Sequence, residues 1–283
     1  MIELFATDDE TVELELKGVD IPPCPSILLE IDAELKRSDP DQRKISALIG
    51  RDVALSGHVM QIASSPAFCT GKAPASILQA LGMLGNQQLF NLVVHQLLKV
   101  ALSENSRLPM EQFWEASAVT ARLAAEAARR LRCIRPDIAY TIGLFRDCGI
   151  PLLARRFDST LEVQREAYAS ADEPFVELEN RRLGTSHVVV GYFLARRWRL
   201  PDEVCKAIRL HHDYTVFAEG DQHSPLLLGL VAVGAIAEYV AQRSLNAART
   251  LEWQKAAGPV AAYLDMSGDA LEEFCDELLD WLE

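Results

Sequence analysis

Apolar residues recur at helical spacing through almost the whole chain, and this pattern restricts the fold more than any other feature. From Ser26 onward the apolar positions follow the i, i+3, i+4, i+7 rule, as in segments 26–38, 110–133 and 267–283. Prolines and glycines separate such segments, and a long helical region is expected to break at Gly85. The sequence contains no repeat of fixed period. The pattern therefore predicts an all-α fold, a bundle of many helices.

The N-terminal segment has a different pattern. Residues 11–21, TVELELKGVDI, alternate apolar and acidic side chains, which is typical of a strand with one buried face. Lys17 and Gly18 interrupt this alternation at a position that suits a turn. The segment predicts a short β-strand or β-hairpin ahead of the helices.

Charge and composition exclude several classes of function. The chain of 283 residues has a formal net charge of −13, which disfavours binding to nucleic acid and to an anionic membrane. Its six cysteines include no C-x-x-C pair, which argues against a zinc ribbon and fits a reducing compartment. The N-terminus lacks a signal-peptide pattern, so a cytoplasmic location is expected. The apolar run 225–243 is long enough to cross a membrane, but its glycines and Glu238 favour a buried helix.

The stretch GLFRDCGIPLLARRF, residues 143–157, places an Arg-Asp pair within an apolar helical pattern. A buried carboxylate costs several kcal/mol unless it is paired or binds a metal, so Asp147 needs a partner. Pro151 lies four residues later and lacks the N–H that would bond the Asp147 carbonyl in a continuous helix. One helix is therefore expected to end near Asp147, with its side chain facing inward.

Three histidines also fall on inward-tending helical faces. His187 shares a face with Val190 and Leu194, while His211 and His212 follow Ile208 by three and four positions. One such histidine is typical of a core residue with a satisfied hydrogen bond. Three of them together with an aspartate favour a polar pocket instead, and they are ligand types that zinc, iron and manganese use.

At these residues the chain resembles the HDOD proteins, relatives of the HD-domain metal-dependent phosphohydrolases. The resemblance implies three regions: a short extension at 1–20, the HDOD domain at 21–214, and helices at 215–283 that complete or extend an HD-like bundle. The matching segments follow the family order and are IPPCPSILLEI (21–31), LIGRDVALSGHVMQIASSPAF (48–68), SILQALGMLGNQQLFNLVV (76–94), FWEASAVTARLA (113–124), GLFRDCG (143–149), SHVVVGYFLARRWRLPDEV (186–204) and IRLHHD (208–213).

The departures from the catalytic relatives matter most. Those enzymes build a metal site from a first histidine, a His-Asp doublet, further histidines and a late aspartate. In this chain the first position is Ala116, the doublet is Arg146-Asp147, and the late acid is expected where Glu238 stands, in an uncertain register. The resemblance thus predicts a vestigial site composed of Ala116, Arg146, Asp147, His187, His211 and His212.

Arg146 puts a permanent cation where the catalytic relatives have a neutral ligand. Its guanidinium can either repel a metal and satisfy Asp147, or point outward, because adjacent helical positions diverge by about 100°. No metal cofactor is expected. A single divalent ion held by the remaining ligands, Asp147, His187, His211 and His212, is the alternative.

The resemblance implies a non-catalytic regulatory module for signal transduction. Such a module would act through a protein partner or bind a small ligand in the vestigial pocket, without nucleic acid or membrane. The C-terminal helices could also supply a homodimer face. Two alternatives remain: a metal-dependent phosphohydrolase acting on a nucleotide or cyclic dinucleotide, and a purely structural helical scaffold.

Overall fold

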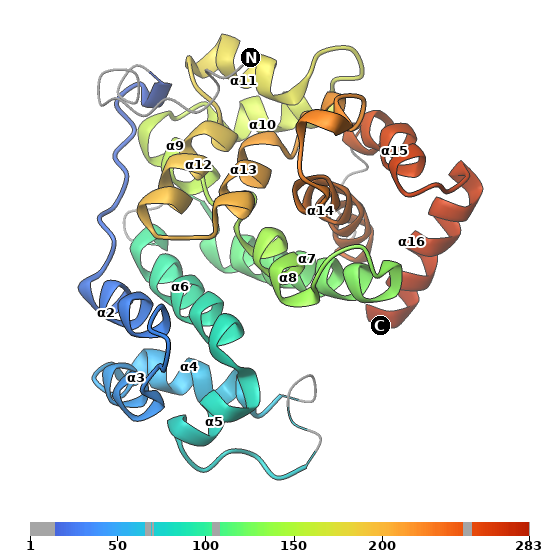
Figure 1. Ribbon diagram of the computed structural model, residues 1–283. Helices are drawn as coiled ribbons and strands as arrows, with labels where there is room; N and C mark the ends of the chain where they lie inside the picture. The colour runs from blue at the N-terminus through green and yellow to red at the C-terminus, as the bar shows by residue number, and fades with distance from the viewer. Residues whose placement is uncertain (1–14, 66–68, 70, 104–107, 246–250, 283) are drawn as a thin grey trace. The chain divides into compact units, whose positions relative to one another are not determined.

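The computed structural model describes residues 15–65, 69, 71–103, 108–245 and 251–282. Within these residues the protein is all-α and contains no β-strand, as the helical periodicity predicts (Figure 1). The chain forms two compact units. The smaller contains the described residues of 22–104 together with 197–199, and the larger contains the remainder. The domain boundaries expected at residues 20 and 214 stay a prediction.

The smaller unit is built from five helices around an aliphatic core that includes Leu28, Ile31 and Leu55. Two of its helices begin where aspartates accept backbone N–H bonds, at Asp41 and Asp52. Gly85, with φ +74°, separates its last two helices, so the break falls where the sequence predicts it. The helices are α2 (Ser26–Leu35), α3 (Gln42–Ile49), α4 (Val53–Ala63), α5 (Ile77–Leu84) and α6 (Asn86–Ser103).

The larger unit contains the segment with Asp147 and the three histidines. Its centre is formed by α7, α8 and α14, which pack on one another. The α-helices of this unit are α7 (Met110–Leu131), α8 (Pro136–Phe145), α9 (Ile150–Arg156), α10 (Thr160–Ala169), α11 (Phe175–Leu183), α12 (His187–Arg197), α13 (Asp202–Leu210), α14 (Pro225–Ser244), α15 (Glu252–Tyr263) and α16 (Gly268–Leu282). Two short 3₁₀ turns, η1 (Tyr214–Phe217) and η2 (Gly220–Gln222), connect α13 to α14.

Small residues let α7 and α8 approach closely. The face of α7 toward the core carries alanines that are 0% exposed, such as Ala121 and Ala124. A Cβ added at Gly143 of α8 would lie only 2.6 Å from the Ala121 Cα atom and 2.7 Å from the Thr120 carbonyl oxygen. This contact fixes the end of α8, and therefore the start of the turn that carries Asp147.

The apolar segment 225–243 forms α14, the helix that by length and composition could cross a membrane among the described residues. Of its most apolar window, 72% is buried inside the protein, which is the behaviour of a core helix. Ser224 caps its N-terminus by accepting a hydrogen bond from the Leu227 N–H. The burial of α14 agrees with the interpretation of this run as a buried helix.

The predicted N-terminal strand or hairpin is wrong in its described part. Residues 1–14 lie outside the described residues, but Glu15 and Leu16 are helical. Lys17 (φ 51°) and Gly18 (φ 77°) then form a left-handed turn that ends this helical segment. Alternation over a few residues is a weak signal because the same residues also fit the end of a short helix.

The Gly143 contact gives a testable prediction for stability. Gly143→Ala should lower the free energy of unfolding by at least about 1–3 kcal/mol, because its Cβ would meet rigid backbone of α7. Urea unfolding followed by circular dichroism measures the change. Gly268→Ala, in the first turn of α16 with no atom near its added Cβ, is the control and should change stability by under about 0.5 kcal/mol. Equal effects of the two substitutions would contradict the close approach of α7 and α8.

Candidate functional site

Asp147 lies in the short turn between α8 and α9. The turn begins after Phe145, the last residue of α8, and closes with a hydrogen bond from the Ile150 N–H to the Asp147 carbonyl. Pro151 occupies the first turn of α9, where its missing N–H does no harm. A Cβ at Gly149 would lie 2.1 Å from the His187 carbonyl oxygen, so only glycine lets this turn reach α12. The close approach places Asp147 beside His187.

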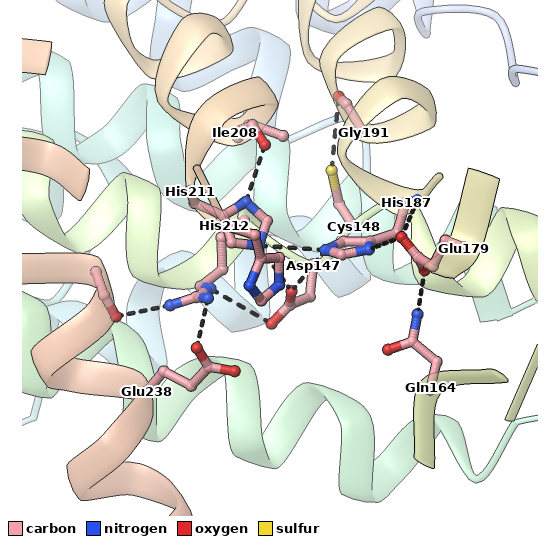
Figure 2. Close-up of polar contacts among 12 residues, drawn as sticks. Asp147, Cys148, Gln164, Glu179, His187, Gly191, Ile208, His211, His212 and Glu238 are labelled. Atoms are coloured by element: carbon pink, nitrogen blue, oxygen red, sulfur yellow. Dashed lines mark hydrogen bonds and ion pairs between the residues drawn. The ribbon is translucent and has the colours of Figure 1, made fainter. Parts of the chain in front are cut away.

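The structure brings Asp147 together with three histidines. His187 is the first residue of α12, and His211 and His212 directly follow α13. The candidate ligand atoms of Asp147, His187, His211 and His212 all lie within 4.8 Å of one another, and Figure 2 shows these side chains converging. The histidines are at most 6% exposed, whereas the Asp147 side chain keeps 25% exposure.

Each histidine uses its Nδ1 atom to contact a hydrogen-bond acceptor outside the cluster, and Figure 2 shows the contacts of His187 and His211. The partners are Glu179 Oε2 at 2.7 Å from His187, the Ile208 carbonyl at 2.9 Å from His211, and Glu252 Oε1 at 2.8 Å from His212. Because carboxylate and carbonyl oxygens accept hydrogen bonds, each Nδ1 carries the proton and each neutral ring keeps its Nε2 lone pair. These lone pairs belong to the atoms closest to Asp147.

The resulting arrangement has too many acceptors. The Nε2 atoms of His187 and His211 are 3.2 Å apart, and they lie 3.7 and 3.5 Å from Asp147 Oδ1. Asp147 Oδ1 and His212 Nε2 are buried and receive no hydrogen bond within the described residues. Facing lone pairs and an oxygen acceptor need a proton or a cation between them.

The charges around the cluster also suit a cation. Asp147, Glu179, Glu238 and Glu252 supply four carboxylates, and the cations that contact them within the cluster are Arg146 and Lys255. With neutral imidazoles, these four carboxylates outnumber the two cations that contact them. Three imidazoles and one carboxylate are a donor set for zinc, iron or manganese. The residues present therefore fit one divalent ion.

Electrostatic effects differ among these side chains. Burial opposes ionisation of Asp147, but the Arg146 guanidinium and His211 hold its pKa below the usual range. Burial and Arg146 lower the pKa of His211 to about 4. Burial also disfavours the His187 imidazolium, yet the Glu179 and Asp147 carboxylates outweigh it and raise the pKa of His187. His187 therefore takes up a proton most readily when no other cation is bound.

Arg146 turns inward rather than outward. Its side chain is buried, and its guanidinium donates to the Gly234 carbonyl at 2.7 Å and to Glu238 Oε2 at 2.6 Å. Its Nε atom lies 3.6 Å from Asp147 Oδ2. Glu238 also accepts hydrogen bonds from the Tyr168 hydroxyl at 2.9 Å. Arg146 thus faces Asp147 as an ion-pair partner beyond hydrogen-bond distance, and it is hydrogen-bonded to Glu238 of α14.

Two carboxylates at the site escaped the sequence analysis. Glu179 on α11 is 0% exposed and accepts hydrogen bonds from Gln164 and from both the backbone and the ring of His187. Glu252 begins α15, 40 residues after His212. Glu179 lies in a charged helical segment whose pattern is typical of a solvent-facing helix, and Glu252 is the first residue of its helix, a position that is usually exposed. Ala116, by contrast, lies half-buried in α7 and has no side-chain atom that could bind a metal.

Comparison with known proteins adds to this geometry. The HDOD domain family model matches residues 21–214. An uncharacterized protein of Treponema pallidum (strain Nichols) is 28% identical over 210 residues, which is 74% of this chain. The chain spans only 40% of that relative's length.

Solved structures share the fold. An HDOD domain protein of unknown function from Geobacter sulfurreducens is 24% identical, with 97% of both chains covered and a TM-score of 0.68. A proposed phosphohydrolase of Shewanella amazonensis is 20% identical, with 94% of this chain and 98% of that chain covered and a TM-score of 0.63. A proposed signal transduction protein of Marinobacter aquaeolei is also 20% identical, with 99% and 60% covered and a TM-score of 0.65. At these identities the likeness concerns the fold alone.

The Arg146–Glu238 pair gives a second stability prediction. Glu238→Gln should lower the free energy of unfolding by about 3–5 kcal/mol, because it leaves a buried guanidinium without its carboxylate. The double variant Arg146→Met/Glu238→Leu should lose less, since neither member of the buried pair is left without the other. Urea unfolding measures both changes.

The surface pair Arg181–Glu173 provides the matched control. These side chains are 57% and 31% exposed, so Glu173→Gln should cost under about 1 kcal/mol. A Glu238→Gln variant as stable as this control would show that the buried pair contributes little.

Proposed function

The chain belongs to the HDOD domain family, and we propose that it is a regulatory module of signal transduction that does not hydrolyse phosphoesters. Its site would bind one divalent ion through Asp147, His187, His211 and His212. The module would act through a protein partner, or through a small ligand, in the cytoplasm.

The observation that carries this proposal is the position of the Arg146 guanidinium. Hydrolysis by paired metal ions needs two ions about 3.5–4 Å apart that share bridging ligands. Asp147 Oδ1 faces the histidines, but Oδ2 faces Arg146 Nε at 3.6 Å. Two unit charges at about 4 Å and an effective dielectric of about 20 interact by about 4 kcal/mol, and a divalent ion doubles this repulsion. The guanidinium therefore opposes a second ion on that side of Asp147.

The remaining donors support a single-ion site with a positioning role. A divalent ion bound there would act as a Lewis acid and lower the pKa of a bound water. In this chain Arg146 is a permanent cation that is already paired with Glu238. Ala116 stands where the catalytic relatives have their first histidine. Binding at this site would join the α8–α9 turn, α12 and the residues after α13, which are separate elements that each supply a ligand side chain.

One observation favours the alternative of a metal-dependent phosphohydrolase acting on a nucleotide or cyclic dinucleotide. Four convergent donor atoms within 4.8 Å form a complete ligand set for one ion, and some hydrolytic sites need no more. The similar fold of the proposed phosphohydrolase from Shewanella amazonensis is compatible with this alternative but does not favour it.

We predict that the purified full chain, dialysed against Zn²⁺ or Mn²⁺, retains about one ion per chain and shows no metal-dependent turnover of a generic phosphodiester. Asp147→Ala should lose most of the bound ion, because it removes the one anionic ligand. Elemental analysis measures the ion, and release of p-nitrophenol from bis(p-nitrophenyl) phosphate measures turnover.

Arg146→His is the informative partner variant, since it restores a neutral ligand type at the doublet. It should raise the ion content above that of the wild type, provided that circular dichroism shows a native fold. Metal-dependent turnover by the wild type that disappears in Asp147→Ala would overturn the proposal in favour of the hydrolase.

A further inference from the structure

The carboxylate behind His212 comes from a helix outside the matched family segment. Glu252 is the first residue of α15, and the family match ends at residue 214. Glu252 is 3% exposed and uses both oxygens: Oε1 contacts His212 Nδ1 at 2.8 Å, and Oε2 contacts Lys255 Nζ at 3.1 Å. A buried carboxylate at a helix N-terminus also interacts favourably with the helix dipole. Contacts within α15 therefore hold the Glu252 side chain in place.

The orientation of His212 depends on this carboxylate. Its ring stacks on Phe175, with ring centroids 4.3 Å apart and planes within 8°, and this contact leaves rotation within the ring plane open. The bond to Glu252 removes that freedom and keeps the proton on Nδ1. The Nε2 lone pair then points into the acceptor cluster around Asp147, where it receives no hydrogen bond. Glu252 is therefore a positioning residue for the fourth donor.

The His212–Glu252 hydrogen bond also connects α15 to the site. Beside it lies a small cavity of about 10 Å³, just enough for one water molecule, which Glu238 and Glu252 both line. The inner packing at this end of α15 is therefore incomplete. Other polar contacts at this end of α15 are Leu251 N–H to the Tyr168 carbonyl at 2.8 Å, Trp253 Nε1–H to Glu272 Oε1 at 2.7 Å and Lys255 Nζ to the Glu173 carbonyl at 2.9 Å. The His212–Glu252 bond alone among these contacts connects α15 to the cluster.

We propose that Glu252 couples occupancy of the site to the docking of α15 on the larger unit. The proposal rests on the single-ion site proposed above. A histidine that binds a metal through Nε2 donates its Nδ1–H more strongly to a carboxylate partner, so a bound ion strengthens the hold on α15. By thermodynamic linkage, an α15 held in place strengthens binding of the ion by the same factor. α15 and the helix that follows it, α16, are then the part of the protein through which a partner could sense the site.

Hydrogen–deuterium exchange of residues 252–263 in the full chain tests this coupling. Saturating Zn²⁺ should slow exchange in these residues about fivefold or more in the wild type. Glu252→Gln should bind Zn²⁺ about 10–100-fold more weakly by titration calorimetry, and at saturation its α15 exchange should change less than about twofold.

Glu179→Gln is the matched control. Glu179 contacts His187 Nδ1 at 2.7 Å in the same way, but it lies on α11. This variant should also lose about 10–100-fold in Zn²⁺ affinity and yet keep the full protection of α15 at saturation. Equal protection of α15 in Glu252→Gln and the wild type, or no protection in a Zn²⁺-bound wild type, would overturn the coupling.

A metal-free arm separates this proposal from the single-ion site. If the wild type binds no Zn²⁺, the proposed single-ion site is wrong. The link between His212 and α15 is then tested by hydrogen–deuterium exchange of His212→Leu, Glu252→Gln and the double variant without metal. Either single change should speed exchange in α15 severalfold, and the double variant should add nothing, because both remove one shared bond. Additive effects, or no effect of His212→Leu, would disprove the coupling.

Discussion

The buried guanidinium of Arg146 is the group on which the larger unit depends. A buried charge without a partner is strongly destabilising, so the α8–α9 turn and α14 must meet where Glu238 and Gly234 receive it. The same guanidinium faces Asp147 and therefore determines which oxygen of that carboxylate stays available to other ligands. Core packing and the chemistry of the site are linked through one side chain.

The site consequently has two unlike sides. On one side the histidines direct lone pairs at Asp147, and carboxylates or a carbonyl hold the far ring nitrogens. On the other side a permanent cation occupies the region beyond Asp147. The first side attracts a positive ion and the second repels one. In the function proposed here, this asymmetry, rather than the loss of any single ligand, distinguishes the site from one that holds a pair of ions.

The helical fold could be predicted from periodicity because each helix buries a stripe of its own residues, and the break at Gly85 falls where the pattern places it. Asp147 could be singled out as a charge in an apolar segment. Glu179 and Glu252 could not, because Glu179 lies in a segment rich in charge, Glu252 lies at a helix start, and only the tertiary fold buries them. The direction of the Arg146 side chain could not be predicted either. Adjacent positions on a helix point about 100° apart, and the sequence does not show whether Arg146 faces inward together with Asp147. The described end of the predicted strand failed because a few alternating residues do not discriminate a strand from the end of a helix.

The contact between Arg146 and Glu238 joins residues 92 positions apart, and Glu252 follows still later in the chain. Contacts so distant in sequence form late in folding, because a long loop must close before they can form. During synthesis the nascent chain exposes the turn with Asp147 to solvent well before α14 emerges from the ribosome. The site therefore matures only after α14 and α15 have been synthesised, and a chain that stalls before them carries the histidines without the chemistry that their arrangement creates.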